Sequence, residues 1–339
     1  MRVAAVGPRG FGVYLLEGGE LTPTSGEPEA ILAPGFFDIH VHGGNGTDVM
    51  DATPAQFGDL CAYFAGLGYE AFLPTTVTAP LDAVKHFLGN LPSHEMIAGV
   101  HLEGPFISPK FPGAQPKEWI QPIGPEWDPV LRDPRVRVVT LAPELPGATQ
   151  LIARLSEEGV RVGMGHTDAS FAQAEAGFKA GASHVTHTFN AMRGFHHREA
   201  GTAGYALSES GLAAELIYDR LHVCPEAAGI LIRSKPADKL IAVSDGTAAS
   251  GLAAGTRLSM WKHEAIVGNG DVRLPDGTLA GSAITLLDAF RNLAADFGVE
   301  VAIRATSLNP RALLGVTEAP RVELLFDLKF NLLEISPRV

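Results

Sequence analysis

Short apolar runs alternate with helix-periodic stretches along most of the chain. Residues 36–41 form an apolar run that predicts a buried strand. Pro54 then opens a stretch in which Phe57, Leu60 and Phe64 recur every three or four positions, which predicts a helix. The same reasoning predicts further strands over 71–77, 97–102, 136–141, 160–164, 184–188, 214–218 and 240–244, and further helices over 81–91, 148–158, 171–180, 225–233 and 282–297.

Eight strands that alternate with helices predict an α/β protein and favour a (β/α)8 TIM-type barrel. A doubly wound sheet shows the same alternation, so the number of strands alone leaves that fold open. The two ends depart from the pattern, because they read as short strands over 3–6, 12–16, 322–326 and 330–335. We therefore expect a small β-sandwich domain formed by residues 1–34 plus 320–339, and a barrel catalytic domain formed by residues 35–319.

Composition and charge exclude several classes of protein. Hydrophobic residues make up 46% of the chain and charged residues 19%, which suits a large buried core and not a disordered chain. A net charge of −12 disfavours general binding to nucleic acid or to an anionic membrane surface. Two cysteines are too few for a disulfide scaffold. No apolar run approaches the ~20 residues of a membrane span, and the first residues lack an apolar signal segment, so we expect a cytoplasmic protein.

Polar residues of a particular kind stand at the C-terminal ends of the predicted strands. The C-terminal ends of barrel strands meet at one mouth, where active sites are built. These candidates are therefore expected to converge although they are far apart in the sequence. They are His40, His42, Glu103, His166, His187, Asp219, His222 and Asp245.

Imidazole and carboxylate side chains in this arrangement indicate a divalent metal site. His40 and His42 are two positions apart on a strand, so they point to the same face and can share one ion. Such ligands suit zinc or iron(II). A metal with an open position lowers the pKa of bound water to about 7, and Asp245 is placed to accept that proton. The residues thus predict metal-assisted hydrolysis of an amide, ester or ring C–N bond. We expect His101 and His184 to face away from the site.

Five segments carry a family resemblance. Together they resemble the N-acetylglucosamine-6-phosphate deacetylase family of the amidohydrolase superfamily, over roughly residues 34–317. The pair of segments at 101–106 and 186–192 is the specific part, because the His-x-His pair alone occurs in many amidohydrolases. The segments are 34–43 (PGFFDIHVHG), 101–106 (HLEGPF), 165–167 (GHT), 186–192 (THTFNAM) and 279–282 (LAGS).

The resemblance implies a fold and a set of metal ligands. The family fold is a (β/α)8 barrel with a small β-sandwich made from both termini. By resemblance, Glu103, His166 and His187 would hold the main metal. A second ion would be held by His40, His42 and Asp245, with Glu103 as a bridge. One or two divalent ions per subunit are therefore expected, either zinc or iron, with cobalt or manganese also acceptable to these ligands. Asp245 matches the catalytic acid and base of the family.

The resemblance also implies substrate contacts and a partner subunit. Arg198 and His222 match the pair that binds the substrate phosphate, and in the family this pair reaches the substrate of the neighbouring subunit of a homodimer. A planar guanidinium suits phosphate. The remaining substrate-binding candidates are Ala114, Gln115, Asn190, Ala191, Asp219, Leu279, Ala280 and Gly281.

Two departures from the family pattern affect the substrate prediction. Gln115 stands where the family usually has a histidine that helps to polarise the scissile carbonyl, and an amide cannot carry positive charge. Arg220 stands where the family usually has glycine, which would add a cation beside the phosphate position.

The expected reaction is hydrolysis of the acetamide of N-acetyl-D-glucosamine 6-phosphate to D-glucosamine 6-phosphate and acetate. Gln115 and Arg220 keep an alternative open, in which the same scaffold acts on another N-acetylated sugar phosphate or on an N-acyl amino acid. A third hypothesis is a binding protein that keeps the barrel without catalysis. The complete ligand set and Asp245 argue against that third hypothesis.

Overall fold

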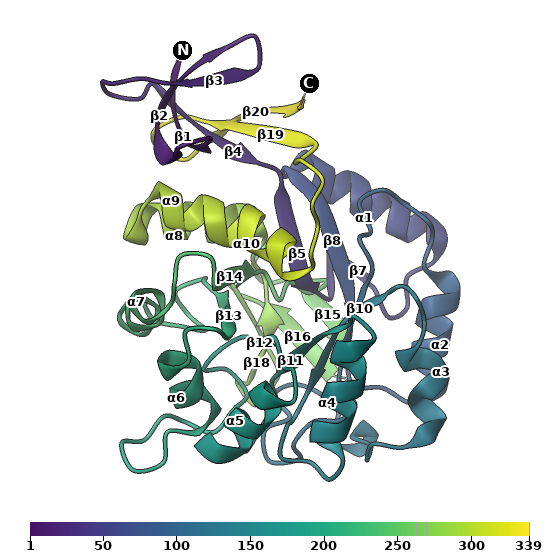
Figure 1. The fold of residues 1–339 in the computed structure, drawn as a ribbon. Helices are drawn as coiled ribbons and strands as arrows, with labels where there is room; N and C mark the ends of the chain where they lie inside the picture. Colours follow the sequence, from purple (N-terminus) through teal and green to yellow (C-terminus); the bar gives the residue numbers. More distant parts are fainter. Residues whose placement is uncertain (262, 269, 339) are drawn as a thin grey trace.

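The computed structural model describes residues 1–261, 263–268 and 270–338, and within them the chain forms three sheets of four or more strands (Figure 1). The largest has eight strands and carries the candidate ligands. A six-stranded sheet lies beside the two chain ends, and a four-stranded sheet is inserted late in the chain. The alternation of strands and helices read from the sequence is therefore confirmed.

The eight-stranded sheet is parallel and almost closes into a barrel. Its edge strands meet where Asp245 N–H donates to the carbonyl of His40 at 2.9 Å, and Val41 bridges to Gly246 in parallel. All eight predicted strands are present, although the sixth is only two residues long. In sheet order they are β5 (Phe36–Val41), β8 (Tyr69–Thr76), β9 (Val100–Glu103), β10 (Val136–Leu141), β11 (Arg161–Met164), β12 (His184–Val185), β13 (Ala213–Ile217) and β14 (Leu240–Val243).

Helices cover the outside of the barrel, and local sequence sets their ends. Helix α1 (Pro54–Gly66) begins with a capping box in which Thr53 and Gln56 satisfy each other's backbone N–H groups. Ser170 and Gln173 do the same for α5 (Phe171–Lys179). The other helices on the barrel are α2 (Leu81–Asn90), α3 (Asp128–Leu131), α4 (Ala148–Glu157), α6 (Gly201–Ser208), α7 (Pro225–Ser234) and α8 (Leu286–Phe297).

The start of α8 corrects the helix predicted over 282–297. The carboxylate of Asp288 accepts from the backbone N–H of Thr285 at 2.9 Å and from its hydroxyl at 2.7 Å, which fixes the N-terminus at this point. Ser282 belongs instead to a strand. No helix in the described ranges has both the length and the apolar character that a membrane crossing requires.

The interior of the barrel changes character along its axis. Buried apolar side chains, among them Ile39, Val138 and Ile241, form one cluster inside the barrel. On β13, Ala213 and Ile217 belong to this cluster, but Glu215 between them, on the same face, is polar. A polar layer therefore lies within the barrel, close to the candidate ligands.

The two ends of the chain build one mixed sheet, which lies at one end of the barrel (Figure 1). The sandwich expected from the sequence takes the form of a single six-stranded sheet. The short helix α9 (Val299–Ile303) contacts β1 and β4 of this sheet. A π-helical turn (Arg304–Leu308) and α10 (Asn309–Leu313) follow. In sheet order the strands are β20 (Leu332–Pro337), β19 (Val322–Phe326), β4 (Ala30–Pro34), β1 (Arg2–Gly7), β2 (Gly10–Glu17) and β3 (Glu20–Pro23).

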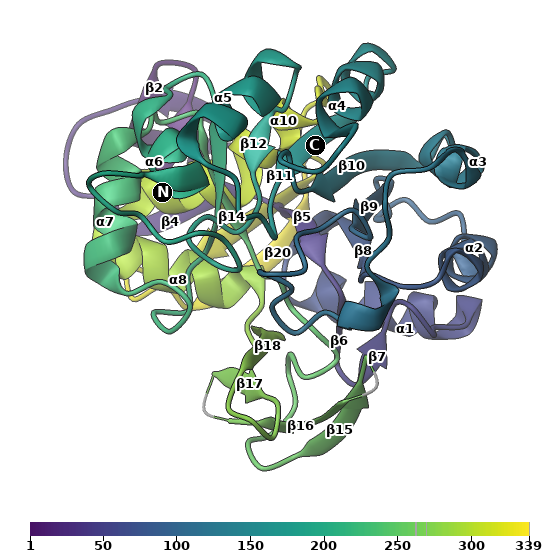
Figure 2. The same cartoon turned by 90° about the horizontal axis from the view of Figure 1, so that it is seen from below.

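The four-stranded antiparallel sheet between β14 and α8 was not anticipated from the sequence. Figure 2 shows it projecting from one side of the barrel. It encloses a small core of its own, which includes Ala265, Val272 and Ala280. Its strands are β15 (Arg257–Met260), β16 (His263–Val267), β17 (Asp271–Arg273) and β18 (Leu279–Ser282), and a two-stranded ribbon of β6 (Gly43–Gly44) and β7 (Thr47–Asp48) lies elsewhere, after β5.

Candidate metal centre and substrate cavity

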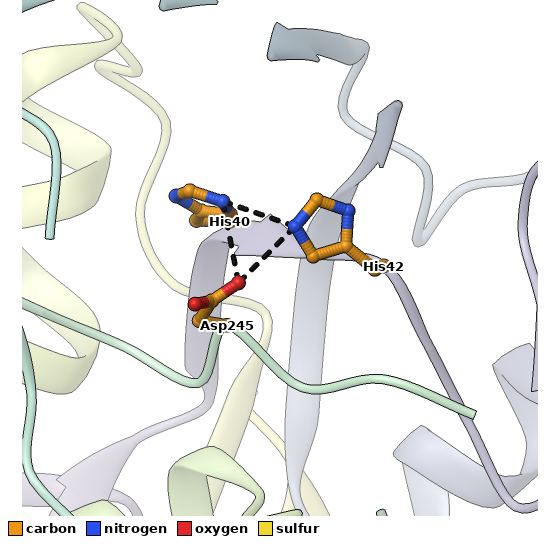
Figure 3. A group of neighbouring side chains, drawn as sticks. All are labelled: His40, His42 and Asp245. Carbon is orange, nitrogen blue, oxygen red and sulfur yellow. Dashed lines mark hydrogen bonds and ion pairs between the residues drawn. The ribbon is translucent and has the colours of Figure 1, made fainter. Parts of the chain in front are cut away.

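The six predicted metal ligands come together at the C-terminal ends of the barrel strands. They form two groups, one of His40, His42 and Asp245 (Figure 3) and one of Glu103, His166 and His187. Within each group the potential ligand atoms all lie within 4.8 Å of one another. All six residues are buried. The structure therefore places the candidates as the strand-end argument predicted.

Glu103 lies between the two groups. Its Oε1 atom is 3.0 Å from His166 Nε2, 3.1 Å from His187 Nε2 and 3.3 Å from His40 Nε2. Its Oε2 atom is 3.5 Å from His42 Nε2. One carboxylate is thus within reach of all four imidazoles, which is the arrangement of a bridging ligand between two cations.

In two places, a pair of histidine ring nitrogens in the centre lies within hydrogen-bond distance, although neither nitrogen of the pair offers a proton to the other. His166 Nε2 and His187 Nε2 are 3.1 Å apart, and His40 Nε2 and His42 Nε2 are 3.3 Å apart. In Figure 3 the two rings of His40 and His42 direct these nitrogens toward Asp245, whose Oδ1 is 3.1 Å from His42 Nε2. Lone pairs that converge in this way fit a shared cation, and imidazole with carboxylate suits a divalent transition metal.

The outer nitrogens of two histidines are held by backbone carbonyls. His42 Nδ1 lies 3.0 Å from the carbonyl oxygen of Thr75, and His166 Nδ1 lies 3.0 Å from that of Phe111. A carbonyl can only accept, so each Nδ1 carries a proton, and in the neutral form of each ring the lone pair is on Nε2. The tautomer needed for a ligand is therefore set by the fold.

The two carboxylates of the centre are held in their charged forms. Burial raises the pKa of Glu103, but the charges of His166 and His40 and hydrogen bonds from His166 and His187 outweigh it, so the pKa lies well below its usual range. Burial likewise raises the pKa of Asp245, and His40 and His42 bring it below the ordinary value. Both groups therefore offer ionised oxygens at neutral pH.

Three of the candidate ligands have left-handed backbone conformations. The φ angles are 47° at His166, 29° at His187 and 47° at Asp245. This region is uncommon for residues with a Cβ atom and costs about 1–3 kcal/mol at each position, and such residues cluster at functional sites. The sequence alone carries no signal for this strain.

A cavity of about 330 Å³ opens from the candidate metal ligands. Many of the predicted substrate contacts line it, namely Ala114, Gln115, Asn190, Ala191, His222, Leu279 and Gly281. Asp219 acts through its neighbour, since its Oδ2 accepts from His222 Nδ1 at 2.6 Å and leaves the other ring nitrogen for a ligand. His222 thus lines the cavity of its own chain, which corrects the expectation that it reaches the neighbouring subunit.

Two predicted substrate residues lie elsewhere in the described part of the chain. Arg198 is exposed, its guanidinium bonds to His197 at 2.9 Å, and it does not line the cavity. The side chain of Ala280 packs into the core of the four-stranded sheet, so the methyl group is not a substrate contact. Ala280 shares a strand with Leu279 and Gly281, and alternation along that strand turns it to the opposite face.

Gln115 lies directly against the candidate metal ligands. Its amide nitrogen donates to Glu103 Oε2, and the same nitrogen is 3.5 Å from His166 Nε2. Its side-chain oxygen accepts from the backbone N–H of Thr78. Gln115 therefore presents a hydrogen-bond donor to the centre.

The expectation that Arg220 adds a cation beside the phosphate position is wrong. Its guanidinium forms two hydrogen bonds with Asp296, at 2.7 and 2.9 Å, and Arg220 is not among the described residues that line the cavity. Asp296 also accepts from the hydroxyl of Tyr218 at 2.6 Å. The charge of Arg220 is therefore paired away from the substrate.

His101 and His184 do not face away from the site. The ring of His101 stacks edge-on against that of His40 at 4.6 Å and bonds to Thr140 Oγ1 at 2.8 Å. His184 Nε2 lies 3.2 Å from Glu215 Oε1. His101 precedes Glu103 by two positions on the same strand, so both side chains point into the barrel. The prediction was wrong because it did not take this alternation into account.

Several cavity residues were missed from the sequence because they lie on the strands or in the connections of the unpredicted four-stranded sheet. They are Trp261, Arg273, Gly277 and Thr278. Arg273 is held by Asp271 at 2.5 Å and by the carbonyl of Gly277 at 2.9 Å. The turn sequence Pro275-Asp276-Gly277 was the available signal for a hairpin here.

Comparison with known proteins places the chain among hydrolases. The sequence profile described as the amidohydrolase family matches residues 31–323. The chain is 39% identical to the N-acetylglucosamine-6-phosphate deacetylase of Bacillus subtilis (strain 168), over 78% of this chain and 70% of that protein. It is 37% identical to the N-acetylgalactosamine-6-phosphate deacetylase of Escherichia coli O157:H7, over 84% and 78%.

A solved structure extends the similarity to a substrate complex. A mutant of N-acetyl-D-glucosamine-6-phosphate deacetylase from Mycobacterium smegmatis, in complex with N-acetyl-D-glucosamine-6-phosphate, superposes with a TM-score of 0.88 at 27% identity. The superposition covers 100% of this chain and 98% of that chain.

Proposed function

The chain belongs to the amidohydrolase family, and we propose that it removes the acetyl group from N-acetyl-D-glucosamine 6-phosphate to give D-glucosamine 6-phosphate and acetate. The observation that carries this proposal is the position of Glu103. It lies between two buried groups of potential ligands on the wall of a cavity that also holds His222 and Arg273. The end of the cavity with the candidate ligands is thus suited to hydrolysis, and His222 and Arg273 on its wall are suited to bind an anion.

The metal centre is proposed to hold one or two divalent ions per subunit. Glu103, His166 and His187 would hold one, and His40, His42 and Asp245 would hold the other with Glu103 as the bridge. Zinc and iron fit these ligands best, and cobalt and manganese are compatible with them. Such an ion supplies an activated water at neutral pH and a positive charge for the carbonyl oxygen.

Asp245 is proposed to move the proton. Its carboxylate is ionised, because the charges of His40 and His42 outweigh the effect of burial on its pKa. It can take a proton from the attacking water as the new C–O bond forms. It can then return that proton to the sugar nitrogen as the C–N bond breaks, which gives the free amine and acetic acid. The acid then loses its remaining proton to the amine or to solvent and leaves as acetate.

His222 and Arg273 are proposed to bind the phosphate. Asp219 Oδ2 accepts a hydrogen bond from Nδ1–H of His222, which leaves the other ring nitrogen for the ligand. Arg273 is the one arginine among the described residues that line the cavity. Two of its N–H groups donate to Asp271 and to the carbonyl of Gly277, and the remaining N–H groups can donate to a phosphate oxygen.

We further propose a homodimer that works in the cytoplasm. Arg198 lies outside the cavity of its own chain and is exposed, and Phe195 in the same loop exposes 59% of its surface. Leu221, next to His222, exposes 49%. These features suit a contact through which Arg198 reaches the cavity of a second subunit. A phosphorylated sugar is charged and does not cross membranes unaided, which supports a cytoplasmic reaction.

The experiment is acetate release from three substrates by the metal-loaded protein. N-acetylglucosamine 6-phosphate should react, unphosphorylated N-acetylglucosamine should react far more slowly, and Asp245→Asn should lower kcat by about 100- to 10,000-fold. N-acetylgalactosamine 6-phosphate is the third substrate, because one relative is named for it. Metal-loaded protein that releases no acetate from any of them would overturn the proposal and direct attention to N-acyl amino acids.

A further inference from the structure

Glu215 is a fully buried carboxylate directly beneath the candidate metal ligands. It lies on β13 inside the barrel, where side chains are usually branched and apolar. Its Oε2 atom is 3.1 Å from His40 Nδ1, and the same oxygen accepts from the backbone N–H of His187 at 3.1 Å. One oxygen of Glu215 therefore contacts a member of each ligand group.

The contact with His40 differs from those of two other ligand histidines. His42 and His166 direct Nδ1 to neutral backbone carbonyls. His40 directs Nδ1 to Glu215 Oε2, a carboxylate oxygen that already accepts a hydrogen bond from a backbone N–H and so acts as an acceptor. The Nδ1 atom of His40 therefore carries a proton, and in the neutral ring the lone pair that a metal needs is on Nε2, 3.5 Å from Asp245 Oδ1. A carboxylate in this position also makes the imidazole a stronger ligand.

The contact with His187 is made through the backbone. The φ angle of His187 is 29°, outside the conformations that a residue with a Cβ atom normally adopts. Strained conformations persist only where neighbouring groups hold them. Two hydrogen bonds to Glu215 hold this segment. His187 N–H donates to the side chain of Glu215, and Thr188 N–H donates to its backbone carbonyl at 2.9 Å.

Burying a carboxylate is costly unless it is paired. Glu215 has the partners described above, and His184 Nε2 lies 3.2 Å from its other oxygen. Each of these partners is a ligand candidate, the residue next to one, or a histidine of the same buried layer. The environment of Glu215 is therefore part of the metal centre and not a separate ion pair.

We propose that Glu215 is a positioning residue that couples the two ligand groups. It fixes His40 in the tautomer that presents Nε2 to the metal, and through the same oxygen it holds the backbone that carries His187. The proposal rests on the metal-dependent function proposed above, but not on the identity of the sugar substrate.

The test is Glu215→Gln, which preserves the shape of the side chain and removes its charge. Metal content after dialysis against buffers of defined free Zn²⁺ should show a 10- to 100-fold weaker affinity at the His40 group. In the metal-free protein, ¹H–¹⁵N spectra of the histidine rings should show the Nδ1–H signal of His40 shifted or lost. Neither readout depends on turnover, and Glu215→Asp, which keeps the charge, should restore part of the affinity.

Glu70→Gln is the matched control. Glu70 is a buried glutamate on another barrel strand, and it pairs with Arg311 away from the ligands. This variant should lower stability and leave zinc affinity unchanged. Wild-type zinc affinity and an unchanged His40 signal in Glu215→Gln would overturn the proposal. If the wild type binds zinc at these residues but releases no acetate, the proposed substrate fails while the role of Glu215 stands.

Discussion

The side-chain oxygen of Gln115 accepts a hydrogen bond of 2.5 Å from the backbone N–H of Thr78. A backbone N–H can only donate, so this contact decides which end of the Gln115 amide faces the metal ligands. The nitrogen end does so and donates to Glu103. Gln115 therefore acts as a donor at this centre and is not oriented to ligate a metal through its oxygen.

Replacing Gln115 by alanine should lower kcat on N-acetylglucosamine 6-phosphate by about 10- to 100-fold, because a donor close to the carbonyl position is removed. Gln115→Glu should lower it further, since a second carboxylate would face Glu103. Steady-state kinetics with metal content measured on the same samples checks both. An unchanged kcat in Gln115→Ala at full metal content would contradict the role as a donor.

Removing single ligands should separate the two metal groups. His42→Ala should lose the ion of the His40 group and keep the one held by Glu103, His166 and His187, whereas His166→Ala should do the reverse. Each should lower kcat by at least about 100-fold, the scale of losing one group that stabilises charge in the transition state. Metal per subunit, measured by elemental analysis after dialysis, is the readout. His86→Ala, which changes an exposed histidine that bonds to Asn90, is the control.

Arg220 should not contribute to substrate affinity. Its guanidinium is engaged by Asp296, so Arg220→Ala should leave KM for the sugar phosphate within about twofold and lower stability by no more than about 1 kcal/mol. Arg220→Gly should be the less destabilising of the two, because φ is 66° at this position. Arg273→Ala is the contrasting variant and should raise KM at least about tenfold for the phosphorylated substrate alone. If Arg220→Ala raised KM as much as Arg273→Ala does, Arg220 would supply a cation beside the phosphate, as the sequence analysis expected.

Stability should rise with pH through the titration of Lys235. This side chain is 7% exposed, and burial lowers its pKa to about 8. Its nitrogen donates to the carbonyls of Glu209 and Leu212, each at 2.7 Å, and the neutral amine can make the same bonds. Between pH 8 and about 10 the unfolded chain holds this proton and the folded chain does not, so the free energy of unfolding increases with pH.

Urea unfolding at pH 7.5 and 9.5 measures this effect. Between these two pH values, the free energy of unfolding should increase by about 1–2 kcal/mol more in the wild type than in Lys235→Met. Lys239→Met, at a half-buried lysine nearby, should keep most of the wild-type gain, because burial lowers the pKa of Lys235 more than the charge of Lys239 does. Parallel pH profiles for the wild type and Lys235→Met would show that Lys235 remains charged in the folded protein.

Local sequence determined the strands and most helices of the barrel and the residues that begin several of those helices. The apolar runs, the capping pairs Thr53 with Gln56 and Ser170 with Gln173, and polar residues after each strand are all short-range features. Because the C-terminal ends of barrel strands must meet at one mouth, the same features placed His40, Glu103 and Asp245 together. The barrel and the meeting of the candidate metal ligands were predictable for this reason.

The tertiary structure decided the contacts that join residues distant in the chain. The partner of Arg220 is Asp296, the carboxylate beneath His40 is Glu215, and Arg273 reaches the cavity on a sheet that the periodicity did not reveal. Pairing across the barrel depends on register and on which face each strand turns inward. The register of β5 with β8 shifts between Asp38 and Val41, so alternation alone cannot be followed across the ligand positions.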